Sequence, residues 1–284
     1  MKIGLLIRYT SGDVDFVVRH GFGSVELLMW PGDPLDPIQT SADELRRAAD
    51  NLRSRGLEIS ALGAYPNVLD PDPVRAKAAA AHLDALLDAC HIMGVDVMGC
   101  FAGRDPEKDV LDNVPAFRQV FTPLVHKAEE LGVTIAIENC PMFRGFPFRG
   151  VNIAYTPEAW DAMFEAVPSP ALGLEYDPSH LVQMLMDYEQ VIYDYGERIF
   201  HVHAKDAEVR PRILAREGVY GKNWHRDRMP GLGDVNWRRV ISALVEVGYN
   251  GNLDIEGRHD PIYQGEREQE GLLLAKRHLE QFVV

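Results

Sequence analysis

The last four apolar runs of the chain each end in a side chain that binds metal ions or moves protons. The four side chains are Glu138, Asp177, His203 and Glu256. Three carboxylates and one imidazole form a hard, oxygen-rich ligand set that suits Mn²⁺ and also fits Mg²⁺, Co²⁺ or Zn²⁺. Without a cation, carboxylates brought together in this way would repel one another, and their pKa values would rise. The pattern predicts one divalent metal ion, provided that the fold makes the four ends meet.

A barrel of alternating strands and helices makes such ends meet. The chain has eight short apolar runs, at residues 2–7, 24–28, 58–63, 95–99, 133–137, 171–176, 199–203 and 252–256. Helical stretches separate them; one begins with a capping box at Ser41 and Glu44, and others end at Gly94 and Gly132. Because parallel strands need crossover connections, we expect an α/β protein with a closed (β/α)₈ TIM barrel. Active sites of such barrels lie at the C-terminal ends of the strands.

Composition favours one globular domain and excludes two classes of partner. The 284 residues are 46% hydrophobic and 25% charged, and no linker-like stretch interrupts them, so we expect a single domain over residues 1–284. A net charge of −14 without a basic cluster argues against nucleic acid as a partner. No stretch approaches the roughly 18 apolar residues that cross a membrane. Three cysteines without CxxC spacing favour a cytoplasmic location.

Five segments resemble one enzyme family. "IAIENCP", "GLEYDPSH", "FHVHAKD", "MPGLGDVNW" and "GYNGNLDIEG" resemble the xylose isomerase-like TIM barrel superfamily, in particular its sugar phosphate isomerase/epimerase group. That group includes ketose 3-epimerases, hydroxypyruvate isomerase, inosose dehydratase, keto-glycoside lyases and, more distantly, endonuclease IV. The resemblance covers essentially the whole chain. It implies that Glu138, Asp177, His203 and Glu256 bind the metal and that His180 touches the substrate.

The segment "IFHVHAKDAE" (residues 199–208) places two histidines on the same face of a strand. His203, at the strand end, is the expected ligand. His201 points the same way one layer lower, where it either supports the site or packs inside the barrel. Lys205 and Asp206 lie just past the rim. They either hold a sugar hydroxyl or orient a neighbour, or they form a surface ion pair.

Other candidate substrate-binding residues lie at the same rim. Glu26 is expected at the cavity floor. Tyr65 and Asn67, after the third strand, are expected to stack on or hydrogen-bond a sugar. Arg104, after the fourth strand, either neutralises a carboxylate or lies at the surface.

Two long loops are candidate lids. Residues 207–234 form either a lid that grips a polar ligand or a structural loop, with four notable side chains: Trp224, His225, Arg226 and Arg228. Gly231 and Gly233 fit either the approach of a phosphate or a tight turn. Residues 143–150 fit a lid or an oligomer contact, so a homo-oligomer and a hetero-complex are both compatible with the sequence.

The leading functional hypothesis is proton transfer next to a carbonyl carbon of a ketose or keto-sugar. A divalent ion would bind the carbonyl oxygen and the adjacent hydroxyl, and would stabilise the enediolate. The resemblance implies that Glu138 and Glu256 both bind the metal and act as acid and base. Because they lie three strands apart around the rim, they would reach opposite faces of a substrate. This predicts an isomerase or epimerase.

Three alternatives follow from the same residues. An enediolate can also expel a leaving group, which would give a lyase or dehydratase acting on an inosose or a 3-keto-glycoside, C-glycosides included. Phosphodiester hydrolysis of the endonuclease IV kind fits less well, because it uses more histidines and a basic face. A non-catalytic subunit of a complex is the third alternative, and the intact ligand set argues against it.

Overall fold

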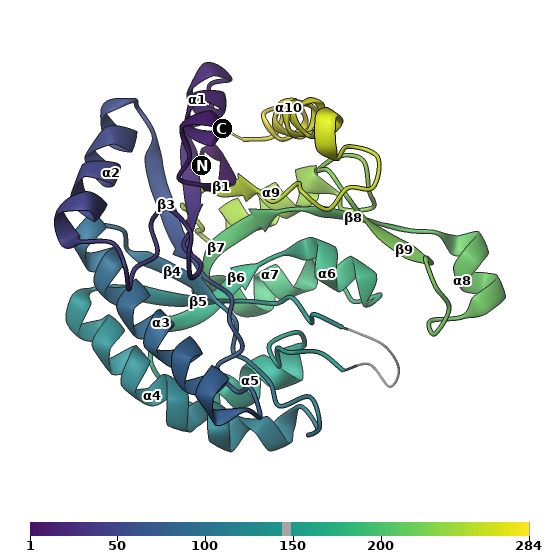
Figure 1. Ribbon diagram of the computed structural model, residues 1–284. Helices are drawn as coiled ribbons and strands as arrows, with labels where there is room; N and C mark the ends of the chain where they lie inside the picture. Colours follow the sequence, from purple (N-terminus) through teal and green to yellow (C-terminus); the bar gives the residue numbers. More distant parts are fainter. Residues whose placement is uncertain (144–148, 284) are drawn as a thin grey trace.

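Eight parallel strands close into a barrel in the computed structural model, which describes residues 1–143 and 149–283 (Figure 1). The strands are β1 (Ile3–Arg8), β2 (Ser24–Leu28), β3 (Glu58–Gly63), β4 (Val97–Cys100), β5 (Thr134–Glu138), β6 (Leu172–Tyr176), β7 (Ile199–Ala204) and β10 (Leu253–Ile255). Their order around the barrel is β1-β10-β7-β6-β5-β4-β3-β2. The predicted (β/α)₈ TIM barrel is confirmed, and each predicted run overlaps one barrel strand.

Helices surround the barrel and connect consecutive strands (Figure 1). They are α1 (Ser11–Arg19), α2 (Ala42–Ser54), α3 (Pro73–Met93), α4 (Val114–Leu131), α5 (Pro157–Ala166), α6 (Pro178–Gln183), α7 (Gln190–Tyr195), α9 (Trp237–Glu246) and α10 (Glu268–Leu279). Short 3₁₀ turns cover Leu111–Asn113, Gly196–Arg198 and Gly265–Arg267. Within residues 1–143 and 149–283, no helix combines the length and the apolar character that a membrane crossing requires.

The helix ends follow local sequence signals. Ser41 Oγ accepts a hydrogen bond from the backbone N–H of Glu44, and the Glu44 carboxylate accepts one from the N–H of Ser41, so α2 begins with the predicted capping box. Gly94 and Gly132 end α3 and α4 with φ values of 63° and 69°. Glycine adopts this left-handed conformation without the steric cost that a Cβ imposes.

The axis of the barrel is polar, although the space between barrel and helices is filled by apolar side chains. Barrels of this kind are ordinarily filled with branched apolar residues. Here the interior holds a set of buried polar side chains that we call the axial column. Its members are Ser24, Glu26, Ser60, Glu175, His201 and Asp254, together with the Tyr65 hydroxyl. The column links β2, β3, β6, β7 and β10 through side chains rather than through apolar packing.

Glycines on the barrel strands leave room for the axial column. A Cβ on Gly63 would lie 2.3 Å from Glu26 Oε1, and one on Gly99 would lie 2.8 Å from the Tyr65 hydroxyl. Real Cβ atoms do not approach other atoms so closely, so a side chain at either position would require the buried Glu26 or Tyr65 side chain to move.

The long segment after β7 forms an ordered arm. β8 (Asp206–Val209) and β9 (His225–Arg228) pair antiparallel, and α8 (Pro211–Glu217) lies between them in the chain. The arm projects away from the barrel on the right of Figure 1. The other predicted lid, at residues 143–150, has its central residues 144–148 outside the described residues.

Asp206 anchors the base of the arm. Its carboxylate accepts hydrogen bonds from the backbone N–H groups of Ala207, Gly231 and Val235 and from Trp237 Nε1. The side chain is fully buried. The expectation of a surface ion pair is therefore wrong, and the hydrogen bonds agree with the other expectation, that Asp206 orients neighbouring groups; its contact with a substrate hydroxyl stays a prediction. The glycine turn at 231–233 wraps around this carboxylate, because the Gly231 N–H is already bound to it.

Asp206→Asn should destabilise the fold. An amide NH₂ would face N–H donors where the native carboxylate accepts, and a buried donor without a partner costs about 1–3 kcal/mol. Thermal or urea unfolding should show this loss. The matched control is Asp234→Asn, since exposed Asp234 accepts one hydrogen bond, from Val209 N–H, that an amide oxygen also accepts. Equal stabilities for the two variants would contradict the anchoring role.

Candidate metal centre

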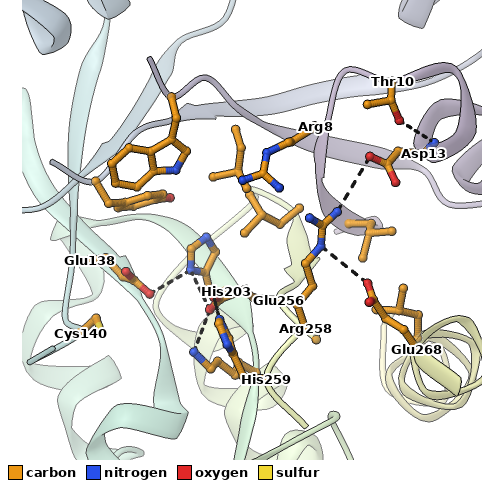
Figure 2. Close-up of a pocket in the computed structure, with 18 of the residues that line it drawn as sticks. Arg8, Thr10, Asp13, Glu138, Cys140, His203, Glu256, Arg258, His259 and Glu268 are labelled. Atoms are coloured by element: carbon orange, nitrogen blue, oxygen red, sulfur yellow. Dashed lines mark hydrogen bonds and ion pairs between the residues drawn. The ribbon is translucent and has the colours of Figure 1, made fainter. Parts of the chain in front are cut away.

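The four predicted ligands meet at the C-terminal mouth of the barrel. Glu138, Asp177, His203 and Glu256 each offer one ligand atom, and these atoms all lie within 4.8 Å of one another. Glu138 Oε1 lies 3.1 Å from His203 Nδ1, and Glu256 Oε2 lies 3.8 Å from the same nitrogen. Figure 2 shows Glu138 and Glu256 next to the His203 ring.

Asp177 is oriented by the start of α6. It is the N-cap residue of that helix: its Oδ1 accepts the Ser179 N–H at 2.8 Å, and Pro178 occupies the first helical position. This use of Oδ1 leaves Oδ2 directed at the other ligands. Asn139 adds a second restraint, because its amide both donates to the Asp177 carbonyl (2.8 Å) and accepts from the Asp177 N–H (2.7 Å).

Glu138 is held by an equivalent amide. Asn152 Nδ2 donates to the carbonyls of Glu138 and Cys140, both at 2.8 Å, and its Oδ1 accepts the N–H of Ala102 at 3.0 Å. Asn152 is fully buried. The ends of β4 and β5 are therefore fixed to each other before any ligand arrives.

The residues present fit a divalent ion. Asp177 Oδ2 is buried, and within the described residues no donor meets it with hydrogen-bonding geometry. Burial of a carboxylate without compensation costs several kcal/mol, so three crowded carboxylates need positive charge. Oxygen donors with one imidazole are the ligands that Mn²⁺, Mg²⁺ and Zn²⁺ accept.

Cationic side chains supply part of that charge. Lys205 Nζ lies 3.0 Å from Glu256 Oε2, and His259 Nε2 lies 3.0 Å from Glu256 Oε1. Burial raises the pKa of Glu256, but Lys205 and His259 outweigh it and hold the pKa well below the usual range. His180 Nε2 lies 3.2 Å from Asp177 Oδ2 and in the same way leaves the pKa of Asp177 below its usual value despite burial.

Beneath the centre, the two buried glutamates of the axial column carry opposite pKa shifts. Burial raises the pKa of Glu175 well above its usual value, and neighbouring carboxylates add to the effect. Burial also opposes ionisation of Glu26, but His203 and His201 outweigh it, so the pKa of Glu26 is lowered. Glu26 is therefore the ionised member of the pair.

Two cavities join at the centre. The first, which we call the α1/α10 cavity, has a volume of about 680 Å³ and is the one in Figure 2. Its walls include Phe16, Leu28, Trp30, Tyr65, Phe101 and Leu272. The second, the α6/arm cavity, has a volume of about 750 Å³ and is lined by Met184, Leu185, Met186, Trp224 and His225, among others. Cys140, Met142, Lys205 and His259 line both.

The predicted substrate-binding residues divide into two groups. His180, Lys205, Tyr65 and Trp224 line the cavities, although the Tyr65 hydroxyl points into the axial column rather than into the cavity.

Three other predicted residues, Asn67, Arg104 and Arg226, are not among the lining residues of either cavity and have structural partners, so their contact with a substrate stays a prediction. Asn67 Oδ1 accepts the N–H groups of Leu69 and Arg104, while buried Arg104 donates to the Lys108 carbonyl. Arg226 pairs with Glu208 across the arm at 2.6 Å.

Sequence reasoning missed Trp30, Glu175, Asp254 and His259. Asp254 lies on β10 two positions before Glu256, which directly follows that strand. This spacing was a usable signal, because side chains two positions apart share a strand face. Glu175 lies beside the register shift at Leu174/Glu175, which obscures that alternation. His259 follows Glu256 by three residues in a loop and carried no such signal.

Asp177→Asn should remove the metal and leave the barrel folded. The amide oxygen still caps α6, but Oδ2 is replaced by a neutral NH₂ that cannot coordinate. The loss of affinity should exceed the roughly 10–100-fold that loss of an outer-shell partner costs. Metal analysis after dialysis and circular dichroism are the measurements. Asp227→Asn, at the same rim but outside the ligand set, is the control. Full metal occupancy in Asp177→Asn would exclude Asp177 as a ligand.

Comparison with known proteins agrees with this geometry. A family model described as "Xylose isomerase-like TIM barrel" matches residues 14–279. An inosose isomerase of Bacillus velezensis is 26% identical over 246 residues, covering 86% of this chain and 81% of that protein. An inosose dehydratase of Geobacillus thermodenitrificans is 27% identical over 234 residues, covering 74% and 72%.

A solved structure of the IOLI protein with a binding zinc atom superposes with a TM-score of 0.74 at 20% identity, covering 100% of this chain and 99% of that one. Fold, mouth cluster and family model agree: the chain belongs to the xylose isomerase-like TIM barrel family, whose relatives include sugar isomerases, epimerases and dehydratases.

Proposed function

We propose that this protein is a metal-dependent isomerase or epimerase that moves a proton next to the carbonyl of a ketose or keto-sugar. The observation that carries the proposal is that two glutamates lie near the same nitrogen of His203. Glu138 on β5 and Glu256 after β10 both approach Nδ1. They come from separate parts of the rim and face the cavity together with Lys205. Two carboxylates so placed are able to exchange protons with opposite faces of a molecule bound between them.

Glu138, Asp177, His203 and Glu256 would hold the ion, with Mn²⁺ as the first candidate and Zn²⁺ as the second. A divalent ion in this position supplies Lewis-acid polarisation of a carbonyl oxygen and stabilises the negative charge that develops on it. The zinc atom in the similar IOLI structure supports the choice of a divalent ion.

The protein's own residues supply proton transfer and positioning. Burial opposes ionisation of Glu256, but Lys205 and His259 outweigh it and lower its pKa, so the carboxylate carries the charge that binding of a cation needs. Lys205 is almost fully buried and reaches Asp177 as well, at 4.0 Å. It therefore fixes the Glu256 carboxylate relative to the rest of the centre.

The α1/α10 cavity suits a sugar ring. Tyr65 and Phe101 pack with ring centroids 5.1 Å apart, and Trp30 and Tyr65 with centroids 6.5 Å apart, so three aromatic side chains form one wall. The C–H faces of a sugar pack on such a wall while its oxygens turn to the charged centre. Recognition of a keto-sugar also agrees with the activity that the name of the Bacillus velezensis relative states.

A second candidate function is a lyase acting on a keto-glycoside, and the α6/arm cavity favours it. This cavity lies next to the centre, since Lys205 and His259 line both cavities. Its wall contains Met184 and Met186 and the Trp224 ring. Methionine walls adapt to flat apolar groups, and each cavity alone has the size of a drug-sized ligand site. A glycoside would place its sugar in one cavity and its leaving group in the other.

Glu138→Gln and Glu256→Gln should each lower turnover of the true substrate by roughly 10²–10⁴-fold, the contribution of general acid/base catalysis. An amide oxygen still coordinates, so each variant should retain some metal. The variant that lacks the abstracting base should lose exchange of the substrate's alpha proton with D₂O, followed by NMR. The variant that lacks only the returning acid should still exchange.

The control for this pair is Glu107→Gln, an exposed glutamate in the loop after β4. Its turnover and exchange should match those of the native protein. Near-native turnover in both active-site variants would instead make His180 the candidate base.

The lyase candidate predicts a preference for large leaving groups. With 3-keto-glucosides, Trp224→Ala should reduce release of p-nitrophenol roughly tenfold or more, because an apolar pocket contact is worth about 1–3 kcal/mol. The methyl glycoside, which does not reach the α6/arm cavity, serves as the internal control. Equal effects on both substrates, or no aglycone release by the native protein, would remove the lyase candidate and leave the isomerase proposal intact.

A further inference from the structure

The two ring nitrogens of His203 face different surroundings. Nδ1 lies 3.1 Å from Glu138 Oε1 at the mouth. Nε2 lies 2.7 Å from Glu26 Oε2 inside the barrel, with hydrogen-bonding geometry. The His203 side chain is about 1% exposed, so both contacts are buried. One imidazole thus connects the axial column to the metal centre.

We propose that Glu26 is the positioning residue of this centre: its carboxylate accepts the Nε2–H of His203 and so holds the Nδ1 lone pair toward Glu138, Asp177 and Glu256. The inference rests on the proposed metal centre and adds a residue from β2, a strand that contributes none of the four ligands. Metal-binding histidines commonly donate their other N–H to a carboxylate, which fixes the tautomer and the ring orientation and raises the basicity of the ligand nitrogen.

Glu26 is itself held in place, as a positioning residue must be. The Tyr65 hydroxyl donates to Glu26 Oε1 at 2.6 Å, which leaves Oε2 for His203. His201 Nε2 lies 3.3 Å from Oε2 and 3.2 Å from Asp254 Oδ2. The pairing of β2 with β3 shifts register between Val25 and Glu26. Such irregularities re-aim a side chain, and here the side chain faces His203.

Glu175 lies in the same place but does not make the same contact. Its Oε1 is 3.3 Å from His203 Nε2 and, within the described residues, has no hydrogen-bond partner. Its Oε2 lies 2.9 Å from the oxygen of the Tyr65 hydroxyl, whose single proton goes to Glu26. Both glutamates are thus buried and both lie next to the Tyr65 hydroxyl, but only Glu26 makes the hydrogen bond to His203. Glu175 is therefore a matched control for Glu26.

The competing interpretation is a second ion in the axial column. Glu26, Glu175, His201 and His203 also offer ligand atoms that all lie within 4.8 Å of one another. Under that interpretation the native protein binds two equivalents of metal, and Glu26 and Glu175 are equally required for the second. Under the positioning role the protein binds one equivalent, and the two glutamates differ.

The test is calorimetric titration of metal-free protein with Mn²⁺ and with Zn²⁺, using the native chain, Glu26→Gln and Glu175→Gln. We expect one equivalent in all three. The dissociation constant should rise roughly 10–100-fold in Glu26→Gln, as for other outer-shell carboxylates, and should be unchanged within error in Glu175→Gln. Unchanged affinity in Glu26→Gln, or equal losses in both variants, would overturn the positioning role while leaving the metal centre standing. Two equivalents in the native protein would establish the competing interpretation. No binding by the native protein would overturn the metal centre and the inference together.

A measurement on the native protein covers the case in which Glu26→Gln fails to fold. With ¹⁵N-labelled histidine and ¹¹³Cd²⁺ bound, NMR should show cadmium coupled to Nδ1 of His203 and a proton retained on Nε2. Coupling to Nε2, or loss of the Nε2 proton, would overturn the assignment. A role for Glu26 in packing alone predicts no such asymmetry between the two nitrogens.

Discussion

Buried carboxylates around a single imidazole are the constraint on which the rest of this structure depends. Acidic side chains of β2, β5, β6 and β10 all point to the barrel axis near His203. In a low-dielectric interior such charges repel strongly, and each costs several kcal/mol unless it is compensated. His201 and His203 on β7 and the buried Lys205 contact these carboxylates and provide that compensation from inside the barrel. The candidate metal centre lies at the mouth end of this group of charged side chains, so it belongs to the same network of compensating charges.

Rigidity at the mouth comes from amides rather than from ionic pairs. Asn139 joins the end of β5 to that of β6, and Asn152 joins β5 to the segment after β4. Uncharged amides satisfy backbone groups without adding charge to an already acidic region. The backbone that carries Glu138 and Asp177 is thereby held by bonds that are independent of ionisation, which agrees with the preorganisation that catalytic sites require.

The sequence predicts the fold and the mouth of the barrel well, since parallel strands bring all their C-terminal ends to one face. This is why Glu138, Asp177, His203 and Glu256 are found together. The interior is less predictable, because Glu26 and Glu175 both lie at register shifts that break the period-two pattern. Tyr65 shows the same limit: its place at the rim follows from its strand, but the direction of its hydroxyl depends on residues far away in the chain. Asp206 was misassigned because the donors it binds come from a turn about 25 residues later, as the Gly231 N–H shows.

The glycines that face the axial column have a consequence for how such a barrel changes over generations. Gly63 and Gly99 accept no side chain while Glu26, Glu175 and Tyr65 are present. Replacing the column by small apolar residues while these glycines remain would leave voids, and voids in a core are costly. A single substitution in an apolar barrel, whether to a glycine or to a charged residue of the column, would therefore be costly by itself. A change in the charged residues or in the glycines alone would leave a void or a close contact, so the two features of this interior depend on each other.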